Sequence, residues 1–396
     1  MTLSVDRSTA VEQVLDAVRA WIGAQVPAAW REAASTATPL REVRTFAEYE
    51  AWYPTFAASG LVVPTWPFAY GGLDLEPAVA RRVEALLSPL GLGRLNPLGL
   101  NLCAPALFAH GTEEQRLRYL PRIVDNTERW CQLFSEPGAG SDLASLATRA
   151  ERDGDDWRLT GQKVWTTWAH VSDWAVCLAR TDPDAPKRDG ITYFLVDIHA
   201  AGVEVRPLRH ITGEVDFNEV FLDGVRVPDG QRVGAQGEGW KVANATLSGE
   251  RQMVSGSGSG GVDRIGGGSA DGLLQRHITD PVLRDRVLRL WAEEQIRGWT
   301  NRRLRGGPLT SIGKVHQGDL NQRIQLAAVD LLGAHATAWE GGHLDRTVKG
   351  MLRSRANTIE GGTTEVNKNV IGERVLGLPR EPDPYRRVAW KGIPRS

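Results

Sequence analysis

The sequence of 396 residues lacks several features that would each point to a particular environment. No stretch approaches the roughly 20 apolar residues that a helix needs to cross a bilayer, and the chain does not open on a basic segment followed by an apolar run. Neither sign of charge is in excess, because 47 Lys and Arg stand against 48 Asp and Glu without long runs of like charge. We therefore expect no membrane insertion and no nucleic-acid partner, and a small molecule or another protein remains as the ligand.

Cysteine is scarce as well. Cys103, Cys131 and Cys177 are odd in number and too widely spaced to form a zinc or redox motif. We expect them to be reduced, buried structural thiols in a cytoplasmic protein, and we predict no metal site. The length exceeds that of a usual single domain, so two or three packed domains are expected.

The first third of the chain reads as helical. Thr9 and Glu12 predict a capping box, and apolar residues then recur at helical spacing as far as residue 26. Pro and Gly punctuate the segments that follow. Further helices are expected at 46–59, 76–87 and 113–124.

From about residue 131 to 235 the pattern changes to short β-rich runs separated by Gly, Asp and Pro turns. The runs lie at 157–165, 174–180, 190–198, 202–207 and 216–227. Even spacing without intervening helices favours an antiparallel barrel over a parallel nucleotide-binding sheet.

Helical periodicity returns after Gly239. Asp280 and Pro281 predict the start of one helix, and another is expected at about 313–336. The predicted fold class is therefore mostly α with a central β-barrel, divided into domains 1–130, 131–235 and 236–396. The Gly- and Ser-rich segment 255–269 is expected to break any helix that begins near Trp240. It is interpreted as a loop beside the active site, with an inert linker as the alternative.

Two segments in the central part have the composition of a cofactor site. Glu136–Asp142 is a glycine-bearing turn, whose backbone N–H groups can approach phosphate or carbonyl oxygens, although surface turns of this composition are common. Gly161–Thr167 is a strand that ends in an aromatic residue and two hydroxyls, which suits stacking and hydrogen bonding to a planar heterocycle. A core Trp beside β-favouring Thr is the alternative in a chain with 14 Trp.

A third polar segment, Asn357–Asn367, contains two Gly, three Thr and two carboxylates before a predicted helix. Free amides at the start of a helix can bind an anion or an oxyanion. An ordinary helix cap is the alternative.

In this order, these segments resemble the acyl-CoA dehydrogenase family, and the resemblance extends over nearly the whole chain. The segments that carry it are 64–67, 70–72, 111–115, 118–121, 135–142 and 361–365. Each is short, but their joint order and spacing make coincidence implausible. The resemblance implies the family's acyl-CoA dehydrogenase fold, with an N-terminal helical domain, a central β-barrel and a C-terminal four-helix bundle.

The implied activity is FAD-dependent α,β-dehydrogenation of an acyl-CoA thioester, with an electron-transfer flavoprotein as the electron acceptor. By resemblance, Ser141 faces the cofactor or the thioester chain, and Arg251 binds the coenzyme A portion. The residues that the resemblance assigns to FAD are Gln132, Phe134, Ser135, Gly140, Ser141, Trp165, Thr166, Thr167, Thr363 and Glu365.

The catalytic base is the informative case. Many family members have a glutamate directly before the Gly-Thr of the C-terminal loop, where this chain has Gly361, and Glu360 lies one residue early. One residue rotates a side chain by roughly 100° around a helix. Other members carry the base on the first helix of the C-terminal domain, and there Glu250 matches.

We therefore expect Glu250 to be the base and the Gly361 N–H to donate to the thioester oxygen. A carboxylate in a water-poor acyl pocket has its pKa raised, which suits a base working near neutral pH. A surface carboxylate paired with a nearby cation is the alternative interpretation of Glu250.

Two family segments that reach the FAD of a neighbouring subunit are absent, and Gln275–Ile278 and Asp330–Ala334 stand in their places. This departure resembles the heteromeric acyl-CoA dehydrogenases of actinobacterial steroid side-chain breakdown. It implies a second acyl-CoA dehydrogenase-like subunit and a bulky, branched or steroid-derived acyl group, with a homo-oligomer as the alternative. A flavin monooxygenase or oxidase on the same scaffold, or a partner subunit without activity of its own, are the competing functions.

Overall fold

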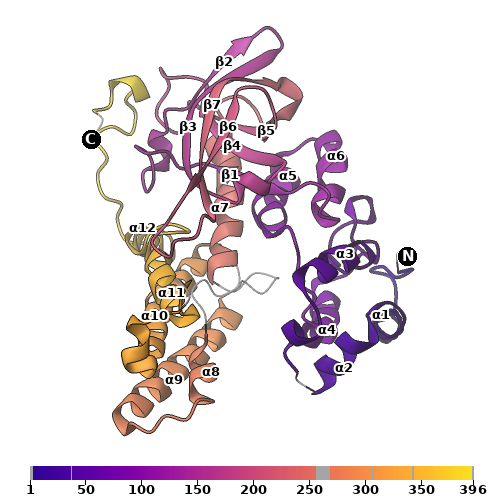
Figure 1. Ribbon diagram of the computed structural model, residues 1–396. Helices are drawn as coiled ribbons and strands as arrows, with labels where there is room; N and C mark the ends of the chain where they lie inside the picture. The colour runs from indigo at the N-terminus through magenta and orange to yellow at the C-terminus, as the bar shows by residue number, and fades with distance from the viewer. Residues whose placement is uncertain (1–2, 37, 256–267, 305–306, 341–342, 395–396) are drawn as a thin grey trace. The chain divides into compact units, whose positions relative to one another are not determined.

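The computed structural model describes residues 3–394 except 37, 256–267, 305–306 and 341–342, and the predicted loop 255–269 lies largely outside them (Figure 1). Contacts divide the chain into two compact units. The first comprises Met1–Cys131 with Val171–Ala175, and the second comprises Gln132–His170 with Val176–Ser396. All three cysteines are described, are buried and form no disulfide. Among the described residues, no helix is both long and apolar enough to cross a membrane.

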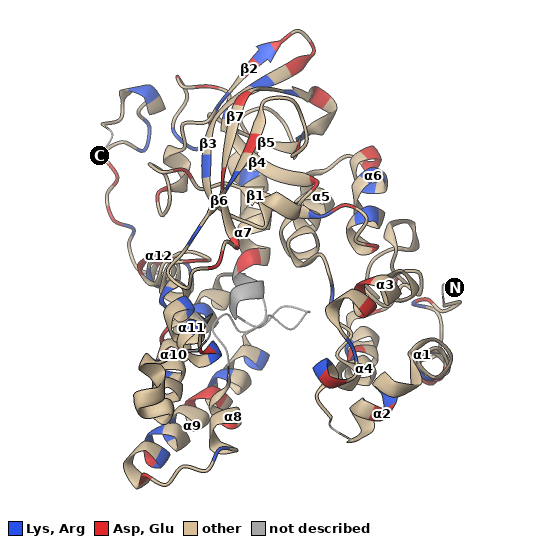
Figure 2. Cartoon of the chain, viewed as in Figure 1, with Lys and Arg blue, Asp and Glu red and all other residues tan. Residues whose placement is uncertain are grey.

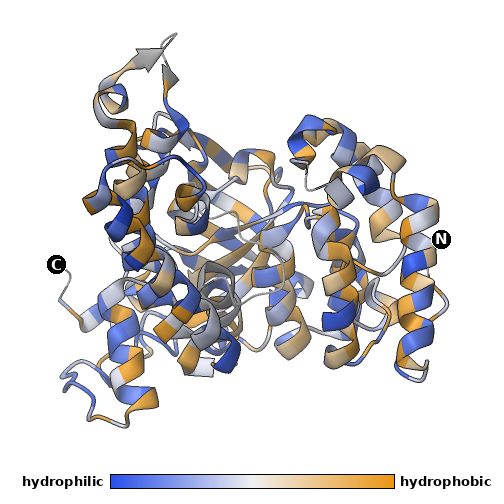
Figure 3. Ribbon diagram, turned by 90° about the horizontal axis from the view of Figure 1, so that it is seen from below, coloured by the Kyte–Doolittle hydropathy of each residue, from blue (hydrophilic) through white to orange (hydrophobic). Residues whose placement is uncertain are grey.

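The first unit is helical, as predicted. Its α-helices are α1 (Val11–Gln25), α2 (Ala28–Thr36), α3 (Phe46–Ala57), α4 (Pro77–Leu87), α5 (Ala104–His110) and α6 (Glu113–Val124). In α1, Val14, Leu15, Val18 and Trp21 are buried, at the spacing of one helical face. Burial of such side chains contributes about 1.5–3 kcal/mol each. Apolar and polar residues lie side by side along the helices, as expected of amphipathic elements (Figure 3).

The predicted capping box at Thr9 and Glu12 is wrong. Ala10 is the N-cap of α1 and makes no side-chain cap, while the Thr9 hydroxyl accepts from the backbone N–H of Asp6 at 3.0 Å. Capping boxes are present instead at the start of α3, with Thr45 and Glu48, and of α6, with Thr112 and Gln115. The Thr9 side chain braces the preceding turn, because the helix begins one residue later than the pattern predicted.

The predicted strands are confirmed, and additional short strands join them in an eight-stranded sheet with the order β6-β7-β3-β2-β4-β5-β8, in which β1 also pairs with β4 (Figure 1). The strands are β1 (Trp130–Leu133), β2 (Arg149–Asp153), β3 (Asp156–Thr167), β4 (Trp174–Arg180), β5 (Ile191–Asp197), β6 (Val203–Leu208), β7 (Phe217–Pro228) and β8 (Arg232–Val233). Its central ladder is the long antiparallel pair β3–β7.

The sheet is open, so the predicted closed barrel is wrong. Closure requires a continuous ladder between the first and last strands. At one end β8 has only two residues, which pair with Tyr193 and Phe194 before the chain turns into a helix. At the other end β6 is partly exposed along its length. Even spacing of antiparallel strands is common to open sheets and barrels, and pairing between the two edge strands decides between them.

The C-terminal part of the second unit is helical. Its α-helices are α7 (Gly239–Ser255), α8 (Ala270–Leu274), α9 (Pro281–Arg303), α10 (Thr310–Leu332), α11 (Arg346–Ser354) and α12 (Thr364–Val370). The Asp280 carboxylate accepts from the N–H groups of Val282 and Leu283, which confirms the predicted start of α9. Positive and negative residues are interspersed along α9, consistent with the balanced charge of the chain (Figure 2).

The α10 helix is the centre of this helical part, since it packs against α7, α9, α11 and α12. Buried residues occur around much of its circumference rather than along one stripe. Gly318 allows close approach, because a Cβ there would lie 2.7 Å from the carbonyl oxygen of Asn357. The helix is thereby brought against the polar segment 357–367 that the sequence singled out.

Candidate active site

A buried ion pair joins the glycine-bearing turn to the sheet. The Lys163 ammonium on β3 is fully buried and lies 2.8 Å from the carboxylate of Glu136. It also donates to the carbonyl oxygens of Phe134 at 3.2 Å and Leu178 at 2.8 Å. All three donor positions of the ammonium are therefore used, as a buried charge requires.

The Glu136 carboxylate also accepts hydrogen bonds from the backbone. It accepts from the backbone N–H groups of Ala147 at 2.6 Å and Thr148 at 2.9 Å. Burial by itself raises the pKa of Glu136, but the Lys163 ammonium and these hydrogen bonds outweigh it and hold the pKa below its usual value. The pair fixes the beginning of the turn beside β3, where the Val164 N–H donates to the Ser135 carbonyl oxygen at 2.9 Å.

The end of β3 departs from regular strand geometry at Trp165. The register with β7 shifts between Lys163 and Thr166, and Trp165 has a φ of 60°, which is rare for a bulky residue. Its side chain is 57% exposed, whereas the next residue, Thr166, is buried. Such strain concentrates at ligand sites, since ordinary packing does not require it.

The same residues meet the requirements of a flavin. The Thr166 hydroxyl is buried and has no hydrogen-bond partner among the described residues. A buried hydroxyl without a partner costs about 1–3 kcal/mol, so a ligand atom that satisfies it is favoured. Beside it, the exposed Trp165 indole offers a flat apolar surface for a heterocycle. The residues present therefore fit the predicted cofactor.

A chain of contacts leads from Trp165 to the C-terminal polar segment. The Trp165 ring meets the Phe217 ring edge to face, with centroids 5.7 Å apart. The Arg353 guanidinium of α11 lies over the Phe217 ring, 5.2 Å from its centroid. Arg353 in turn pairs with the Glu360 carboxylate at 3.1 Å. The end of β3 and the segment before Gly361 are thus brought together.

The Glu360 carboxylate is held in a network of its own. Besides Arg353, it accepts from the Asn357 amide at 2.9 Å, and the Asn357 side chain accepts from the Asn321 amide of α10 at 2.7 Å. A carboxylate with a cationic partner and a second donor is held in one position. This geometry is that of a structural brace for the loop.

The loop after Glu360 turns through two glycines with positive φ, 65° at Gly361 and 81° at Gly362. Both values favour glycine because a Cβ is disfavoured in this region. Thr363 then caps α12, accepting from the Val366 N–H at 3.2 Å. The Thr363 hydroxyl is therefore engaged as a helix cap, and the Glu365 side chain is exposed.

The Glu250 side chain reaches the predicted flavin-lining segment from another direction. The α7 helix is anchored on β5, where the hydroxyls of Thr246 and Tyr193 lie 2.9 Å apart. Four residues after Thr246, the partly buried Glu250 accepts from the Gln132 amide at 3.4 Å. This contact brings together the predicted base and a residue predicted to line the flavin.

Other predicted residues are less closely connected. Gly140 and Ser141 are exposed on the turn, and a Cβ at Gly140 would meet nothing within 4 Å. Their neighbour Asp142 pairs with Lys187 at 2.7 Å. The side chain of Arg251 lies outside the described residues, so its predicted contact with coenzyme A stays a prediction.

Sequence reasoning missed the residues that support the site. Lys163 could have been found, because the alternation of Trp157 and Leu159 places it on the buried face of β3, where a charge needs a partner. Arg353 and Phe217 carry no local signal, since their roles depend on which distant segments meet.

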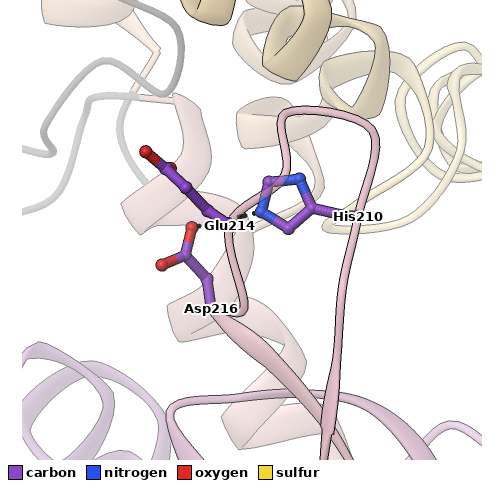
Figure 4. Close-up of side chains that lie close together, drawn as sticks. All are labelled: His210, Glu214 and Asp216. Atoms are coloured by element: carbon purple, nitrogen blue, oxygen red, sulfur yellow. Dashed lines mark hydrogen bonds and ion pairs between the residues drawn. The ribbon is translucent and has the colours of Figure 1, made fainter. Parts of the chain in front are cut away.

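A separate cluster in the loop between β6 and β7 has metal-ligand chemistry. One ligand atom from each of His210, Glu214 and Asp216 lies within 4.8 Å of the others (Figure 4). The His210 ring contacts Asp216 at 3.4 Å and the Thr212 hydroxyl at 3.2 Å. The Glu214 carboxylate pairs with Lys349 at 2.9 Å. These partners already occupy the ligand atoms, so we assign the cluster to bracing of the loop.

Comparison with protein-family models gives three successive matches. The N-terminal domain of acyl-CoA dehydrogenases matches residues 8–127, the middle domain matches 131–225, and the C-terminal domain matches 237–376. Together they span most of the chain.

Individual proteins give the same result. The chain is 39% identical over 382 residues to acyl-CoA dehydrogenase IpdE1 of Mycobacterium tuberculosis, covering 94% of this chain and 98% of that protein. It is similar to a chain of the Tcur3481-Tcur3483 steroid ACAD, with a TM-score of 0.70, 25% identity and coverage of 94% and 98%. It is also similar to a chain of the ChsE4-ChsE5 complex from Mycobacterium tuberculosis, with a TM-score of 0.67, 27% identity and coverage of 94% and 98%.

Proposed function

The chain belongs to the acyl-CoA dehydrogenase family of FAD-binding flavoproteins, and we propose that Glu250 is the base with which it begins α,β-dehydrogenation of an acyl-CoA thioester. The observation that carries this assignment is the contact between Glu250 and Gln132, at 3.4 Å. The competing carboxylate, Glu360, is paired with Arg353 instead. A carboxylate braced in this way is poorly suited to approach the substrate proton.

In this proposal the chain's own residues supply a base and polarisation of the carbonyl. Glu250 accepts the proton from the carbon next to the thioester, and the Gly361 N–H donates to the thioester oxygen as negative charge develops on it. FAD, when bound, accepts the electrons that leave the substrate. The partial burial of Glu250 strengthens electrostatic interactions at this point, since less water screens them.

The flavin ring is proposed to lie against Trp165, Thr166 and Thr167, with Gln132, Phe134 and Ser135 on the adjoining segment. Support comes from the exposed indole of Trp165 and the unpartnered hydroxyl of Thr166. The remaining proposed contacts, to FAD or to the acyl chain, are Gly140, Ser141, Arg251, Thr363 and Glu365.

The same proposal includes the division into domains 1–130, 131–235 and 236–396, with a four-helix bundle in the last, and a cytoplasmic location. The spans of the three family models support the division. Three buried cysteines without a disulfide suit a reducing compartment.

Two measurements test dehydrogenation: the mass of the product and the identity of the electron acceptor. The purified flavoprotein is mixed with acyl-CoAs from straight-chain thioesters to steroid side-chain thioesters, and the product mass is measured. We expect loss of two hydrogens and rapid transfer of electrons to an electron-transfer flavoprotein, with slow reaction with O₂. An oxygenated product, or O₂ as the preferred acceptor, would support the monooxygenase or oxidase alternative instead.

We further propose that the enzyme is a hetero-oligomer with a second acyl-CoA dehydrogenase-like subunit, acting on a bulky, branched or steroid-derived acyl group. Two similar solved structures are two-protein assemblies by name, and one of them is named as a steroid enzyme. Gln275–Ile278 and Asp330–Ala334 replace the segments with which homotetrameric members reach a neighbour's FAD.

The test is FAD per chain, measured after expression alone and after co-expression with candidate partners. We expect low occupancy alone and full occupancy in the complex. Full occupancy in a pure homo-oligomer would contradict the proposal and favour a homo-oligomer that uses other residues.

A further inference from the structure

The end of the chain returns to the loop 181–190, which joins β4 to β5. From α12 the last residues run back beside the strands of the sheet (Figure 1). Residues 376–388 are exposed, whereas Ala389 and Trp390 are half-buried. We call residues 389–392 the C-terminal strap, because the chain is held against the loop there.

Backbone hydrogen bonds hold the C-terminal strap on this loop. The Trp390 N–H donates to the Ala185 carbonyl oxygen at 2.9 Å, and the Lys391 N–H donates to the Pro183 carbonyl oxygen at 3.1 Å. Two consecutive bonds of this kind fix both the position and the direction of the backbone. The Trp390 side chain is thereby placed against the second unit, where it is half-buried.

The Trp390 indole covers a buried cation. The Arg180 guanidinium lies over the indole ring, 4.3 Å from its centroid, and Arg180 is only 3% exposed. A cation over an aromatic face is attracted most strongly where water is excluded. The indole N–H donates to the Ser145 carbonyl oxygen at 3.3 Å. Trp390 therefore contacts both the end of β4 and the short helical turn Leu143–Ser145.

Arg180 joins two segments that are distant in sequence. Its guanidinium donates to the carbonyl oxygens of Ala144 at 2.7 Å and Leu146 at 3.1 Å, just after the glycine-bearing turn. It also donates to the Lys187 carbonyl oxygen in the loop 181–190, at 3.1 Å. Hydrogen bonds from a charged donor are stronger than those between neutral groups. One side chain, covered by the C-terminal strap, thus holds the two segments together.

The glycine-bearing turn Glu136–Asp142 needs this support at its end. Its beginning is fixed by the buried pair with Lys163. Further along, a Cβ at Gly138 or Gly140 would meet nothing within 4 Å, so the middle of the turn is surrounded by open space. Ordering flexible glycines costs entropy when a ligand binds. A turn whose end is already held loses less entropy on binding.

A surface ion pair adds only weakly to this support. The Lys187 ammonium lies 2.7 Å from the Asp142 carboxylate, which also accepts from the Ser145 hydroxyl at 2.5 Å. The Asp142 side chain is 60% exposed, and exposed pairs contribute little because water screens them. The buried contacts of Arg180 with Trp390 are therefore the main support at this end of the turn.

We propose that Trp390 is a positioning residue of the FAD and acyl-CoA site, which acts through Arg180 and the Ser145 carbonyl group to hold the glycine-bearing turn in its ligand-binding conformation. This inference rests on the proposed contact of that turn with FAD or the acyl-CoA. Trp390 itself touches neither ligand. Its removal should therefore weaken binding and leave the chemical step unchanged.

The test compares the wild type with Trp390→Ala, both loaded with FAD and in the native assembly. Exchange of backbone amide hydrogens is measured by mass spectrometry in peptides that cover residues 136–148 and 181–190. The affinity for FAD is measured by fluorescence titration after the flavin has been removed. Values of kcat and KM are measured with the acyl-CoA that gives the dehydrogenated product.

In Trp390→Ala we expect amide exchange in both peptides to be at least about fivefold faster, because the contact over the guanidinium and the indole hydrogen bond are lost together. One of the two ligands should bind about three- to tenfold more weakly. Weaker FAD binding would assign the turn to the cofactor, and a raised KM at full FAD would assign it to the acyl-CoA. In both cases kcat at full FAD should stay within about twofold of the wild type.

Two control variants separate the role of the indole from a general effect on the segment. Trp390→Phe keeps an aromatic ring over Arg180 and should restore most of the wild-type behaviour. Tyr385→Ala removes an exposed aromatic side chain just before the C-terminal strap and should leave exchange, FAD affinity and KM unchanged.

Several outcomes would overturn the inference. Unchanged amide exchange in Trp390→Ala would mean that the C-terminal strap does not hold the turn. Faster exchange with unchanged FAD affinity and KM would make the strap purely structural. A chain that ends at Pro382 covers the case in which the substitution prevents folding, and loss of the folded state in both variants would make the strap a folding element. Failure of the proposed function is distinguishable, since the wild type itself would then give no dehydrogenated product.

Discussion

Replacing Lys163 by methionine should destabilise the protein strongly, because it leaves the Glu136 carboxylate buried without its cation. In the native protein the ammonium satisfies this carboxylate at 2.8 Å together with the carbonyl oxygens of Phe134 and Leu178. Methionine has a similar length but donates to none of these oxygens. The variant therefore tests whether the ion pair holds the glycine-bearing turn Glu136–Asp142 against the sheet.

The expected magnitude follows from the burial of both partners, 0% exposure for the Lys163 side chain and 8% for that of Glu136. Removing one partner of a buried pair costs about 3–5 kcal/mol. The lower end applies, since Glu136 keeps its hydrogen bonds from Ala147 and Thr148 and can also take up a proton. About 3 kcal/mol corresponds to a fall of roughly 6–10 °C in melting temperature for a unit of this size.

The loss of stability in Lys163→Met should depend on pH, and the direction of that dependence can be predicted. In the native protein the pKa of Glu136 is lowered, so its contribution to stability is present above the unfolded value near 4.3 and is lost as the pH falls through the folded value. In Lys163→Met burial remains and the cation is gone, so the pKa rises and ionisation favours unfolding. The difference in stability from the wild type should therefore be larger at pH 8 than at pH 5.

The assay is thermal unfolding of the FAD-loaded enzyme at both pH values, followed by circular dichroism and by flavin release. Lys187→Met is the matched control, because it removes a surface pair with Asp142 and should cost less than about 1 kcal/mol. Melting of Lys163→Met within 2 °C of the control, with the same difference at both pH values, would refute the reasoning. Recovery of most of the loss in Lys163→Met/Glu136→Gln would confirm that the unpaired charge is the cause.

Two further predictions concern the sheet. In Asp229→Ala the buried Trp157 indole N–H loses its acceptor at 2.7 Å, which should cost about 1–3 kcal/mol at neutral pH in a urea titration. The Arg232 guanidinium lowers the pKa of Asp229 to about 2. The wild type should therefore lose the stabilising contribution of ionised Asp229 as the pH falls from about 4 to about 2, and Asp229→Ala should not show this fall in stability. Trp165→Gly should relieve the backbone strain of the φ of 60° and raise the free energy of unfolding of the FAD-free chain by about 1 kcal/mol. It should also weaken FAD binding about three- to tenfold, measured by fluorescence titration. Unchanged FAD affinity in that variant would remove Trp165 from the site.

Much of the fold was predictable because its signals are local. The helix 113–124, one of the segments that Pro and Gly punctuation separates, was predicted with its observed bounds, Glu113–Val124. In the structure Thr112 and Gln115 cap its start, a signal that the sequence also contains. The start of α9 was predicted for the same kind of reason, from Asp280 and Pro281. Missed elements such as α5 are short and apolar, so they show little contrast between faces.

The shape of the sheet was not predictable from spacing. Whether an antiparallel sheet closes depends on pairing between strands that are distant in sequence, here β6 and the two-residue β8. The capping box predicted at Thr9 was also wrong, because a Thr and a Glu at the right spacing do not fix where a helix begins.

At the candidate site, the choice between two carboxylates came from the resemblance to the family. It implied Glu250 as the base, and the structure brings the Glu250 side chain to the Gln132 amide. Glu360 resembles a base by its place before two glycines, yet Arg353 and Asn357 engage it. Asn357 and Arg353 precede Glu360 by only three and seven residues, but their spacing alone does not show that the chain turns back to bring both to its carboxylate.

The most direct measurement of the central claim compares flavin bleaching by acyl-CoA, without oxygen and in a single turnover, in Glu250→Gln and Glu360→Gln. Both variants replace a carboxylate by an amide of the same size, and both must first be shown to hold FAD. The account predicts that bleaching is lost in Glu250→Gln and largely kept in Glu360→Gln. Normal bleaching in Glu250→Gln would contradict it, most plainly if Glu360→Gln were the inactive enzyme.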